Sequence, residues 1–255
     1  IAAVRATLAG YSGQPQRALA LAQEAFRLLG PHNHFIRSTV AYMLAANDPT
    51  KREWRDVEAG FLSAIRSAQA GGNVIIGVAG FYNLAMLQAQ EGDLAGAFAR
   101  LQEAERFAQS QPILWPWPVV DSARVGMGRI HYEGNALEEA RADLQAGLHL
   151  AQQRRNLYII IDGCLALAWL HRAQGEDALA AEALQQAIAL LPKSTRPQTR
   201  WLVMENQVRF WLLQGNVAEA QQWAKQEMGD VDALLLAPAD ATVEGRSGLA
   251  VLHHQ

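Results

Sequence analysis

The chain has 255 residues, of which 50% are hydrophobic and 18% charged, enough apolar material for a substantial core in one or two domains. This composition excludes a mainly disordered protein. The formal net charge is −3, so no global positive field is expected to attract DNA or an anionic membrane. The single cysteine, Cys164, excludes an internal disulfide framework and a zinc site built from several thiolates, and it suits a cytoplasmic protein.

The sequence repeats one pattern with a period of about 40 residues. A glycine is followed five residues later by alanine, four later by an apolar residue and three later by a small residue, as in residues 92–104 and 175–187. Asn135 replaces the glycine in a fifth copy and Arg52 replaces it in a weaker sixth. The turn residues stand at positions 13, 52, 92, 135, 175 and 215, at spacings of 39 to 43 residues, which indicates a repeat protein.

Apolar residues at helical spacing stand before and after each turn, so each repeat is predicted to be an antiparallel helix pair. One pair cannot bury both of its faces, and neighbouring pairs must therefore stack. We expect an all-α fold over residues 1–230: a right-handed superhelical solenoid of about six pairs, with the first helices on the concave wall and the second helices on the convex wall. Residues 231–255 are expected to begin a further, truncated repeat.

In chain order, Pro31 and Pro192 follow second helices, where a ring without an N–H ends a helix. The Trp115-Pro116-Trp117-Pro118 segment lengthens the connection between the third and fourth pairs, and it either covers a groove or fills the junction between repeats. Gly126 and Gly128, in the first helix of the fourth pair, are expected to let helices pack closely.

No catalytic pattern emerges from the sequence. Residues 10–13 read Gly-Tyr-Ser-Gly at a helix–helix turn, unlike the strand-to-helix elbow of a nucleophilic serine. His131 and His171 occupy the same position in successive repeats. They could in principle hold a metal, but we expect them to replace a packing aromatic, since no acidic residue or cysteine joins them at ligand spacing. We therefore expect a protein that is not an enzyme.

A candidate binding groove follows from projecting the first helices onto the concave wall. If the turn residue is numbered 15 in each repeat, positions 2, 5, 9 and 12 face this wall. Arginine offers a planar fork of donors and tryptophan a stacking face, so the groove suits a carboxylate, a phosphate or a polyhydroxylated ligand. The candidate residues are Tyr82, Met86, Arg129, Tyr132, Asp162, Trp169, Arg172, Glu205 and Arg209, of which Met86, Arg129, Trp169 and Arg209 share position 9.

An alternative for these groove residues needs no ligand. Arg129 and Arg209 can pair with Asp162 and Glu205 and leave a groove that is merely solvated. Arg154, near the end of a second helix, is expected to lie outside the groove in either case.

Three segments resemble a known family: HYEGNALEEARADLQAGLHLAQ (131–152), LALAWLHRAQGEDALAAEALQQAIALLP (165–192) and FWLLQGNVAEAQQWAKQ (210–226). They are similar to the helical-repeat region of the large ATP-binding LuxR-type transcriptional activators, the MalT-like group, and the resemblance covers about residues 1–230. Their offsets resemble those of the tetratricopeptide repeat (TPR), with a period near 40 residues in place of 34. In that family the region lies between an N-terminal nucleotide-binding module and a C-terminal helix-turn-helix.

The resemblance implies a cytoplasmic domain that senses an inducer or docks a regulatory partner in the groove. It implies no cofactor in this segment, because ATP binds the N-terminal module and DNA binds the C-terminal helix-turn-helix. The chain indeed contains no G-x-x-x-x-G-K-[ST] phosphate loop. A generic TPR scaffold that binds a partner peptide, with no small-molecule ligand, is the alternative. No membrane contact is expected in either case.

Overall fold

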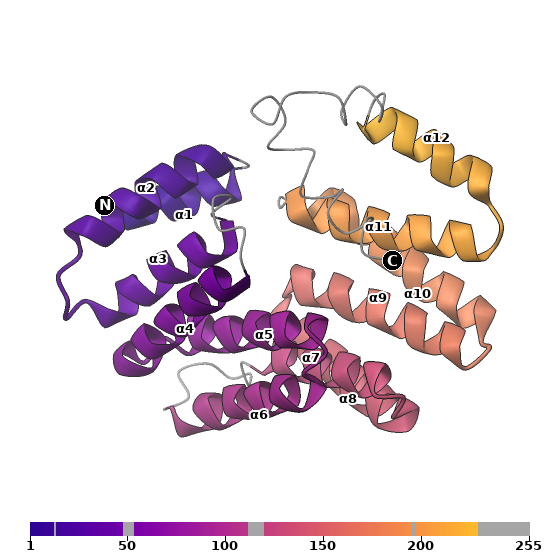
Figure 1. Cartoon of the computed structure of the whole chain (residues 1–255), viewed down its shortest axis with the longest axis horizontal. Coiled ribbons are helices and arrows are strands. Elements are labelled where there is room, and N and C mark those ends of the chain that lie inside the picture. Colours follow the sequence, from indigo (N-terminus) through magenta and orange to yellow (C-terminus); the bar gives the residue numbers. More distant parts are fainter. Residues whose placement is uncertain (13, 48–53, 112–119, 195–196, 229–255) are drawn as a thin grey trace. The chain divides into compact units, whose positions relative to one another are not determined.

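The computed structural model describes residues 1–12, 14–47, 54–111, 120–194 and 197–228 (Figure 1). Throughout these residues the secondary structure is helical, with twelve α-helices, one short 3-10 helix and no strand. The predicted all-α fold is confirmed. The predictions for residues 115–118 and 231–255 lie outside the described residues.

The helices form the predicted pairs. The first helices are α1 (Ala2–Tyr11), α3 (His34–Asn47), α5 (Val74–Gln90), α7 (Asp121–Glu133), α9 (Leu157–Ala173) and α11 (Pro197–Leu213). The second helices are α2 (Pro15–Leu28), α4 (Trp54–Gly71), α6 (Leu94–Ser110), α8 (Leu137–Arg154), α10 (Asp177–Leu190) and α12 (Val217–Met228), and the 3-10 helix η1 (Leu191–Lys193) follows α10.

The turns inside the pairs stand where the repeat pattern places them. Gly92, Gly175 and Gly215 have φ values of 85°, 77° and 78°, and Asn135 has a φ of 59°. This left-handed backbone suits glycine and asparagine, and it explains why these residue types mark the repeat. Positions 13 and 52 lie outside the described residues.

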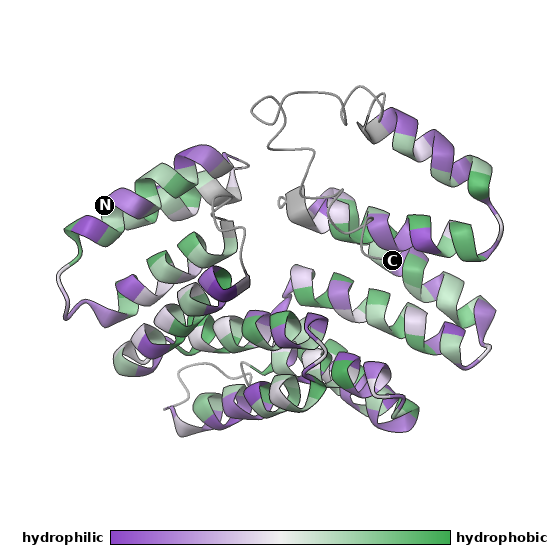
Figure 2. Ribbon diagram, viewed as in Figure 1, coloured by the Kyte–Doolittle hydropathy of each residue, from purple (hydrophilic) through white to green (hydrophobic). Residues whose placement is uncertain are grey.

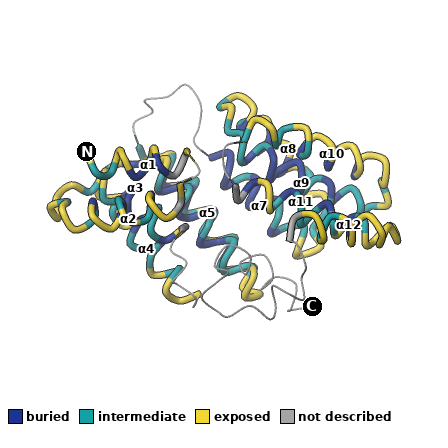
Figure 3. Tube along the Cα trace, turned by 90° about the horizontal axis from the view of Figure 1, so that it is seen from above, coloured by how far each residue is buried: buried dark blue, intermediate teal, exposed yellow. Residues whose placement is uncertain are grey.

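The chain divides into two compact units, residues 1–196 with α1–α10 and residues 197–255 with α11 and α12. In the first unit, α2, α4, α6 and α8 each pack against the first helix of the next pair, and α3, α5, α7 and α9 also contact one another in succession. Figure 3 shows the result in α7 and α9, which are largely buried, while α8 and α10 keep exposed faces. The second unit is a single pair in which α11 packs against α12.

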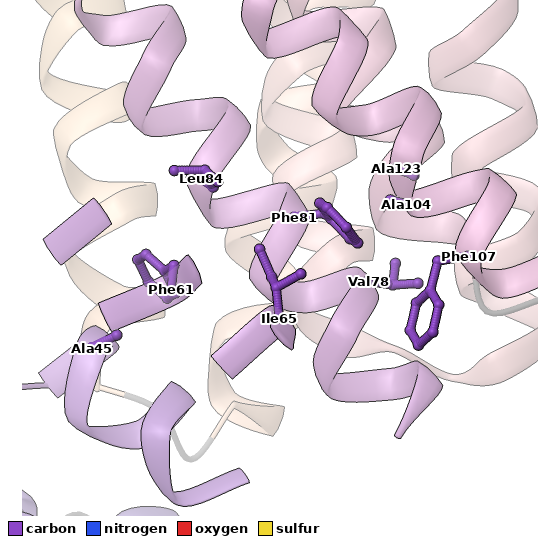
Figure 4. Close-up of a cluster of buried hydrophobic side chains, with 9 residues drawn as sticks. All are labelled: Ala45, Phe61, Ile65, Val78, Phe81, Leu84, Ala104, Phe107 and Ala123. Carbon is purple, nitrogen blue, oxygen red and sulfur yellow. The ribbon is translucent and has the colours of Figure 1, made fainter. Parts of the chain in front are cut away.

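The core runs between the pairs as a series of clusters. One of them joins Phe61 and Ile65 of α4, Val78 and Phe81 of α5 and Phe107 of α6 (Figure 4). The second helices α4 and α6 of this cluster are amphipathic, and Figure 2 shows apolar and polar residues sharing each of them, whereas α5 is apolar over most of its length. Burying one such large side chain contributes roughly 1.5–3 kcal/mol, so the stacking between pairs is the main source of stability.

The two glycines of α7 lie at close contacts with neighbouring helices, as predicted. A Cβ atom added at Gly128 would lie 2.6 Å from Leu144 Cγ and 2.9 Å from the Leu144 backbone nitrogen. At Gly126 it would lie 2.9 Å from Leu101 Cδ2. The close contact between α7 and α8 is therefore possible only because Gly128 has no side chain.

We predict that Gly128→Ala destabilises the protein by about 1–3 kcal/mol, because a methyl group must push α8 away from α7. This overrides the advantage of about 1 kcal/mol that alanine has over glycine inside a helix. Urea denaturation measures the change. Gly30→Ala is the matched control, since an added Cβ at Gly30 meets nothing within 4 Å; equal stability losses in both variants would contradict the packing role.

Candidate functional site

Three predicted groove residues meet in hydrogen-bond contact, each from a different repeat. Tyr82 of α5 donates its hydroxyl proton to Asp162 Oδ2 of α9. Arg129 of α7 donates from Nη1 to Asp162 Oδ1 at 3.0 Å and to the Tyr82 hydroxyl at 3.2 Å. We call these three residues the polar cluster. They stand at positions 5, 9 and 2 of successive repeats, so the contacts run diagonally across the first helices.

The members of the polar cluster differ in burial. The Asp162 side chain and Tyr82 are each only 3% exposed, whereas the Arg129 side chain is 38% exposed. The negative charge of Asp162 raises the pKa of Arg129 above its ordinary value. The pKa of Tyr82 is also raised, mainly because its hydroxyl is buried and secondly because Asp162 is negatively charged. The cluster therefore contains a charged arginine, a carboxylate tied down by two donors, and a tyrosine that keeps its proton.

The geometry leaves Arg129 able to make further contacts. A guanidinium carries five N–H groups, and within the described residues its two hydrogen bonds both come from Nη1. The side chain is thus fixed by Tyr82 and Asp162 and is also partly open to solvent. Such an arrangement can present oriented donors to a carboxylate, a phosphate or a carbonyl group.

Tyr158, at the start of α9, was missed by the sequence analysis. It packs, partly buried, against the hydrophobic cluster that contains Tyr82, and it raises the pKa of both Tyr82 and Arg129. The available signal was its spacing, because residue 158 stands four positions before Asp162 and so shares its helix face.

The other groove residues of the first unit lie in different surroundings. Met86 and Tyr132 are partly buried and pack against two different hydrophobic clusters. Trp169 is also partly buried. Arg172 forms an ion pair at 3.1 Å with the exposed Asp177 at the start of α10.

Glu205 and Arg209 belong to the second unit, where they form an ion pair at 3.0 Å across one turn of α11. Both predicted pairings, Arg129 with Asp162 and Arg209 with Glu205, are therefore present. They do not decide between a ligand site and a solvated groove, since a paired arginine can still bind. The alignment of Arg209 with Arg129 and Trp169 stays a prediction.

A second buried acidic residue lies at the start of α7. Asp121, 1% exposed, accepts hydrogen bonds from Arg154 at the end of α8 and, at 2.8 Å, from Asn156 before α9. Arg154 thus has a structural role, because removing it leaves a buried carboxylate without its cation. It is unsuitable as a neutral control in binding experiments.

His131 and His171 each have a carboxylate neighbour, which the sequence analysis did not predict. His131 Nδ1 lies 3.0 Å from Asp143 Oδ2, and its ring packs on Phe98 with centroids 4.9 Å apart. His171 Nδ1 lies 2.5 Å from Glu176 Oε2, which also pairs with Arg141 of α8. The described residues hold no group of three or more histidine, cysteine, aspartate or glutamate side chains that could bind a metal ion.

The structure also describes the single cysteine and the apolar character of the helices. Cys164 is buried, and this burial raises the pKa of its thiol to about 11, so the thiolate form is disfavoured at neutral pH. Among the helices of the described residues, none combines the length and the apolar character needed to cross a lipid bilayer.

Stacked helix pairs, with polar residues meeting on successive first helices, define a helical-repeat protein of the TPR-like class. Residues 1–239 match the family described as the MalT-like TPR region. The chain belongs to this family, as the three quoted segments predicted. No curated protein matches the chain.

Solved structures of low sequence identity share the repeat architecture. A Rap protein crystallised with Competence and Sporulation Factor aligns with a TM-score of 0.63 and 12% identity, over 90% of this chain. This chain spans 62% of the length of that Rap chain. Two structures of TPR-like repeats from a putative kinesin light chain of Podosopora anserina align at 16% identity over 75% of this chain and 93% and 94% of theirs, with TM-scores of 0.47 and 0.46.

We predict that Tyr82→Phe and Asp162→Asn each destabilise the protein by about 1.5–3 kcal/mol, since each removes a hydrogen bond to a charged or buried group. The double variant should lose less than the sum, with a coupling of about 0.5–3 kcal/mol. Urea denaturation of the four proteins gives this cycle. Tyr82→Phe combined with Arg17→Ala, on the exposed side of α2, should be additive; additivity in the first cycle would mean that the two side chains do not interact.

We also predict a pH-dependent role for Glu176. Hydrogen bonds from His171 and Arg141 hold the pKa of its carboxyl below the ordinary value of 4.5. Because the folded-state pKa is the lower one, the stabilisation is complete above pH 4.5 and disappears as the pH falls through the folded-state value. The difference in Tm between the parent and Glu176→Gln should therefore shrink on acidification from neutral pH to about pH 3. A difference that stays constant over this range would contradict the assignment.

Proposed function

We propose that this chain is the effector-sensing and protein-interaction domain of a MalT-like bacterial transcriptional regulator. Recognition would take place on the face of α5, α7 and α9 that carries the polar cluster. Membership of the MalT-like TPR family supports the regulator context. The single observation that carries the site is Arg129, which is fixed by two neighbouring repeats and is still 38% exposed.

Burial of the Asp162 carboxylate carries a desolvation penalty that apolar packing at the same place would not carry. A buried ion pair often contributes no more than well-packed apolar residues of the same volume. The same arrangement does benefit a binding site, because Tyr82 and Asp162 hold the Arg129 guanidinium in one orientation before a ligand arrives. Less side-chain entropy is then lost on binding. This difference favours recognition over simple stabilisation.

The proposal includes a wider protein context drawn from the family. ATP would bind an N-terminal module and DNA a C-terminal helix-turn-helix, both outside this chain, in a cytoplasmic regulator. The chain itself would act without a cofactor and without catalysis, binding a small-molecule inducer or a protein partner. The Rap protein of similar fold is seen in complex with Competence and Sporulation Factor, which agrees with a factor-binding role for such a stack.

The test is a binding screen of metabolites and peptides against the chain, by calorimetry, followed by variants on every hit. Arg129→Ala should weaken binding about tenfold or more, because a charge-assisted hydrogen bond contributes roughly 1.5–3 kcal/mol. Arg129→Lys keeps a positive charge beside Asp162 but loses the planar fork, so it separates recognition from folding. Trp169→Ala and Arg209→Ala each test one of the other predicted groove residues at position 9.

Arg106→Ala is the matched control, because Arg106 is an exposed arginine on the second helix α6. Its affinity should equal that of the parent. Melting curves recorded beside each titration separate lost binding from lost folding. If a confirmed ligand binds Arg129→Lys and Trp169→Ala as tightly as the parent, recognition lies elsewhere on the chain. If only peptides bind, the chain is a peptide-binding scaffold and not a sensor of small molecules.

A further inference from the structure

The starts of α3 and α5 expose large apolar side chains. Phe35, the second residue of α3, is 56% exposed, and Ile36 after it is 42% exposed. Ile75, the second residue of α5, is 49% exposed. Phe35 and Ile75 stand at equivalent positions of successive repeats, since each lies the same number of residues before its turn position, 52 or 92.

Two contacts hold these helix starts against each other. Asn73, just before α5, donates from Nδ2 to the Phe35 carbonyl oxygen at 3.2 Å and to Ser38 Oγ at 3.0 Å. A Cβ atom added at Gly71, the last residue of α4, would lie 2.8 Å from Phe35 Cα. The junction between α4 and α5 therefore lies directly on the start of α3, and the exposed apolar side chains share one edge of the stack.

The start of α3 is uncovered because α2 is short. In the repeat numbering with the turn residue at 15, α2 ends at position 30 with Leu28, whereas α4, α6 and α8 end at positions 34, 33 and 34. Pro31 cannot continue α2. In α8 the additional turn brings Ala151 into one cluster with Ile159 of α9, which is 3% exposed. Ile36 occupies the same repeat position as Ile159 and lacks this cover.

The same edge is basic. Residues 26–38 and 66–77 contain three arginines and no aspartate or glutamate. Arg27 and Arg66 are exposed, at the same repeat position of α2 and α4, and form no ion pair within the described residues. Arg37 donates to the Leu29 carbonyl oxygen at 2.9 Å instead of pairing with a carboxylate.

Unpaired arginines are unusual in the first unit. Six of its other arginines pair with carboxylates: Arg100, Arg124, Arg129, Arg141, Arg154 and Arg172. We call Arg27, Phe35, Ile36, Arg66 and Ile75 the basic edge. It combines exposed apolar side chains with positive charges that no described carboxylate neutralises.

We infer that the basic edge is a docking surface for an acidic amphipathic segment of a partner protein. Leucine-like or aromatic side chains of this segment cover Phe35, Ile36 and Ile75, and its carboxylates pair with Arg27 and Arg66. Covering the apolar side chains removes them from water. The charges favour an acidic partner and disfavour a basic one, because no acidic residue lies within the segments that form the edge.

A protein segment suits this edge better than a nucleic acid or a membrane. The chain has a formal net charge of −3, so a strongly charged polyanion gains no long-range attraction from it. Contacts to phosphates would leave the three apolar side chains exposed. Binding in a bilayer interface requires a whole apolar helix face, whereas these side chains lie at the ends of two helices.

The test uses a fluorescent peptide of glutamate and leucine, spaced so that the leucines share one helix face. Titrated with the full chain, it should show a saturable rise in anisotropy that weakens with salt. R27Q/R66Q should weaken binding about threefold or more, because two exposed ion pairs are lost. F35Q/I75Q should weaken it about fivefold or more, because less apolar surface is buried.

Folding is checked beside each titration. The four substituted side chains are exposed, and Asn73 holds Phe35 through its backbone carbonyl oxygen. The melting temperatures of both double variants without peptide should therefore match that of the parent.

Matched controls separate the basic edge from general effects. R17Q/R155Q removes two exposed arginines outside the edge and changes the net charge equally, and L179Q removes an exposed leucine of α10. Both variants should bind the peptide like the parent. A peptide with lysine in place of glutamate should not bind.

The inference is overturned if the acidic peptide does not bind, or if it binds R27Q/R66Q and F35Q/I75Q as tightly as the parent. Equal weakening in the control variant without two outer arginines would also overturn it, since overall charge would then explain the binding. Tighter binding of duplex DNA or phosphatidylserine vesicles through the same edge would identify a different occupant. R129K should bind the peptide like the parent, so these outcomes are independent of the polar cluster.

Discussion

An antiparallel helix pair has more apolar surface than the pair itself can cover, and the architecture of this protein follows from that constraint. The first helices α3, α5, α7 and α9 are each covered by the preceding second helix as well as by their own partner. The helices can approach closely enough only where side chains are small, as Gly128 shows against Leu144. Stability is then mostly a sum of contacts between neighbouring pairs.

This constraint explains how much of the fold the sequence predicts. Turn residues recur because the left-handed backbone at Gly92, Asn135 and Gly175 tolerates few residue types. Small residues recur because of close packing. Both are local requirements, so they are visible in one sequence. The connections between pairs are less regular: Arg155 also has a positive φ, of 54°, and nothing in the repeat pattern marks it.

The contacts of the candidate site were harder to predict for a geometric reason. Counting along each repeat places Arg129 and Asp162 on the same wall, and pairing between them was one of two interpretations. Which residues Arg129 bonds to depends on how far one first helix is shifted along the next, and this shift cannot be predicted from the sequence of a single repeat. Arg129, at position 9, accordingly bonds to Tyr82 at position 5 of α5 and to Asp162 at position 2 of α9. Tyr158 packs nearby although it lies before position 1 of its repeat.

Buried charge is used in two different ways in this chain. At Asp121 the carboxylate is shielded from solvent, and its hydrogen bonds with Arg154 and Asn156 tie the junction between α8 and α9 to the start of α7. At Asp162 the counter-charge is a more exposed arginine, with 38% side-chain exposure against 17% for Arg154. The first arrangement closes a junction, whereas the second leaves a positive charge accessible.

The position of the polar cluster determines what a ligand there can change. Tyr82 and Asp162 are 80 residues apart in the chain, and Arg129 joins them across three successive pairs. A ligand that engages Arg129 acts on contacts shared by α5, α7 and α9. It can shift the arrangement of these helices only to the extent that it binds one arrangement more tightly than another. Because most contacts between pairs join neighbours in the stack, such a shift would spread along the stack through the close packing between pairs, which has little room to absorb it.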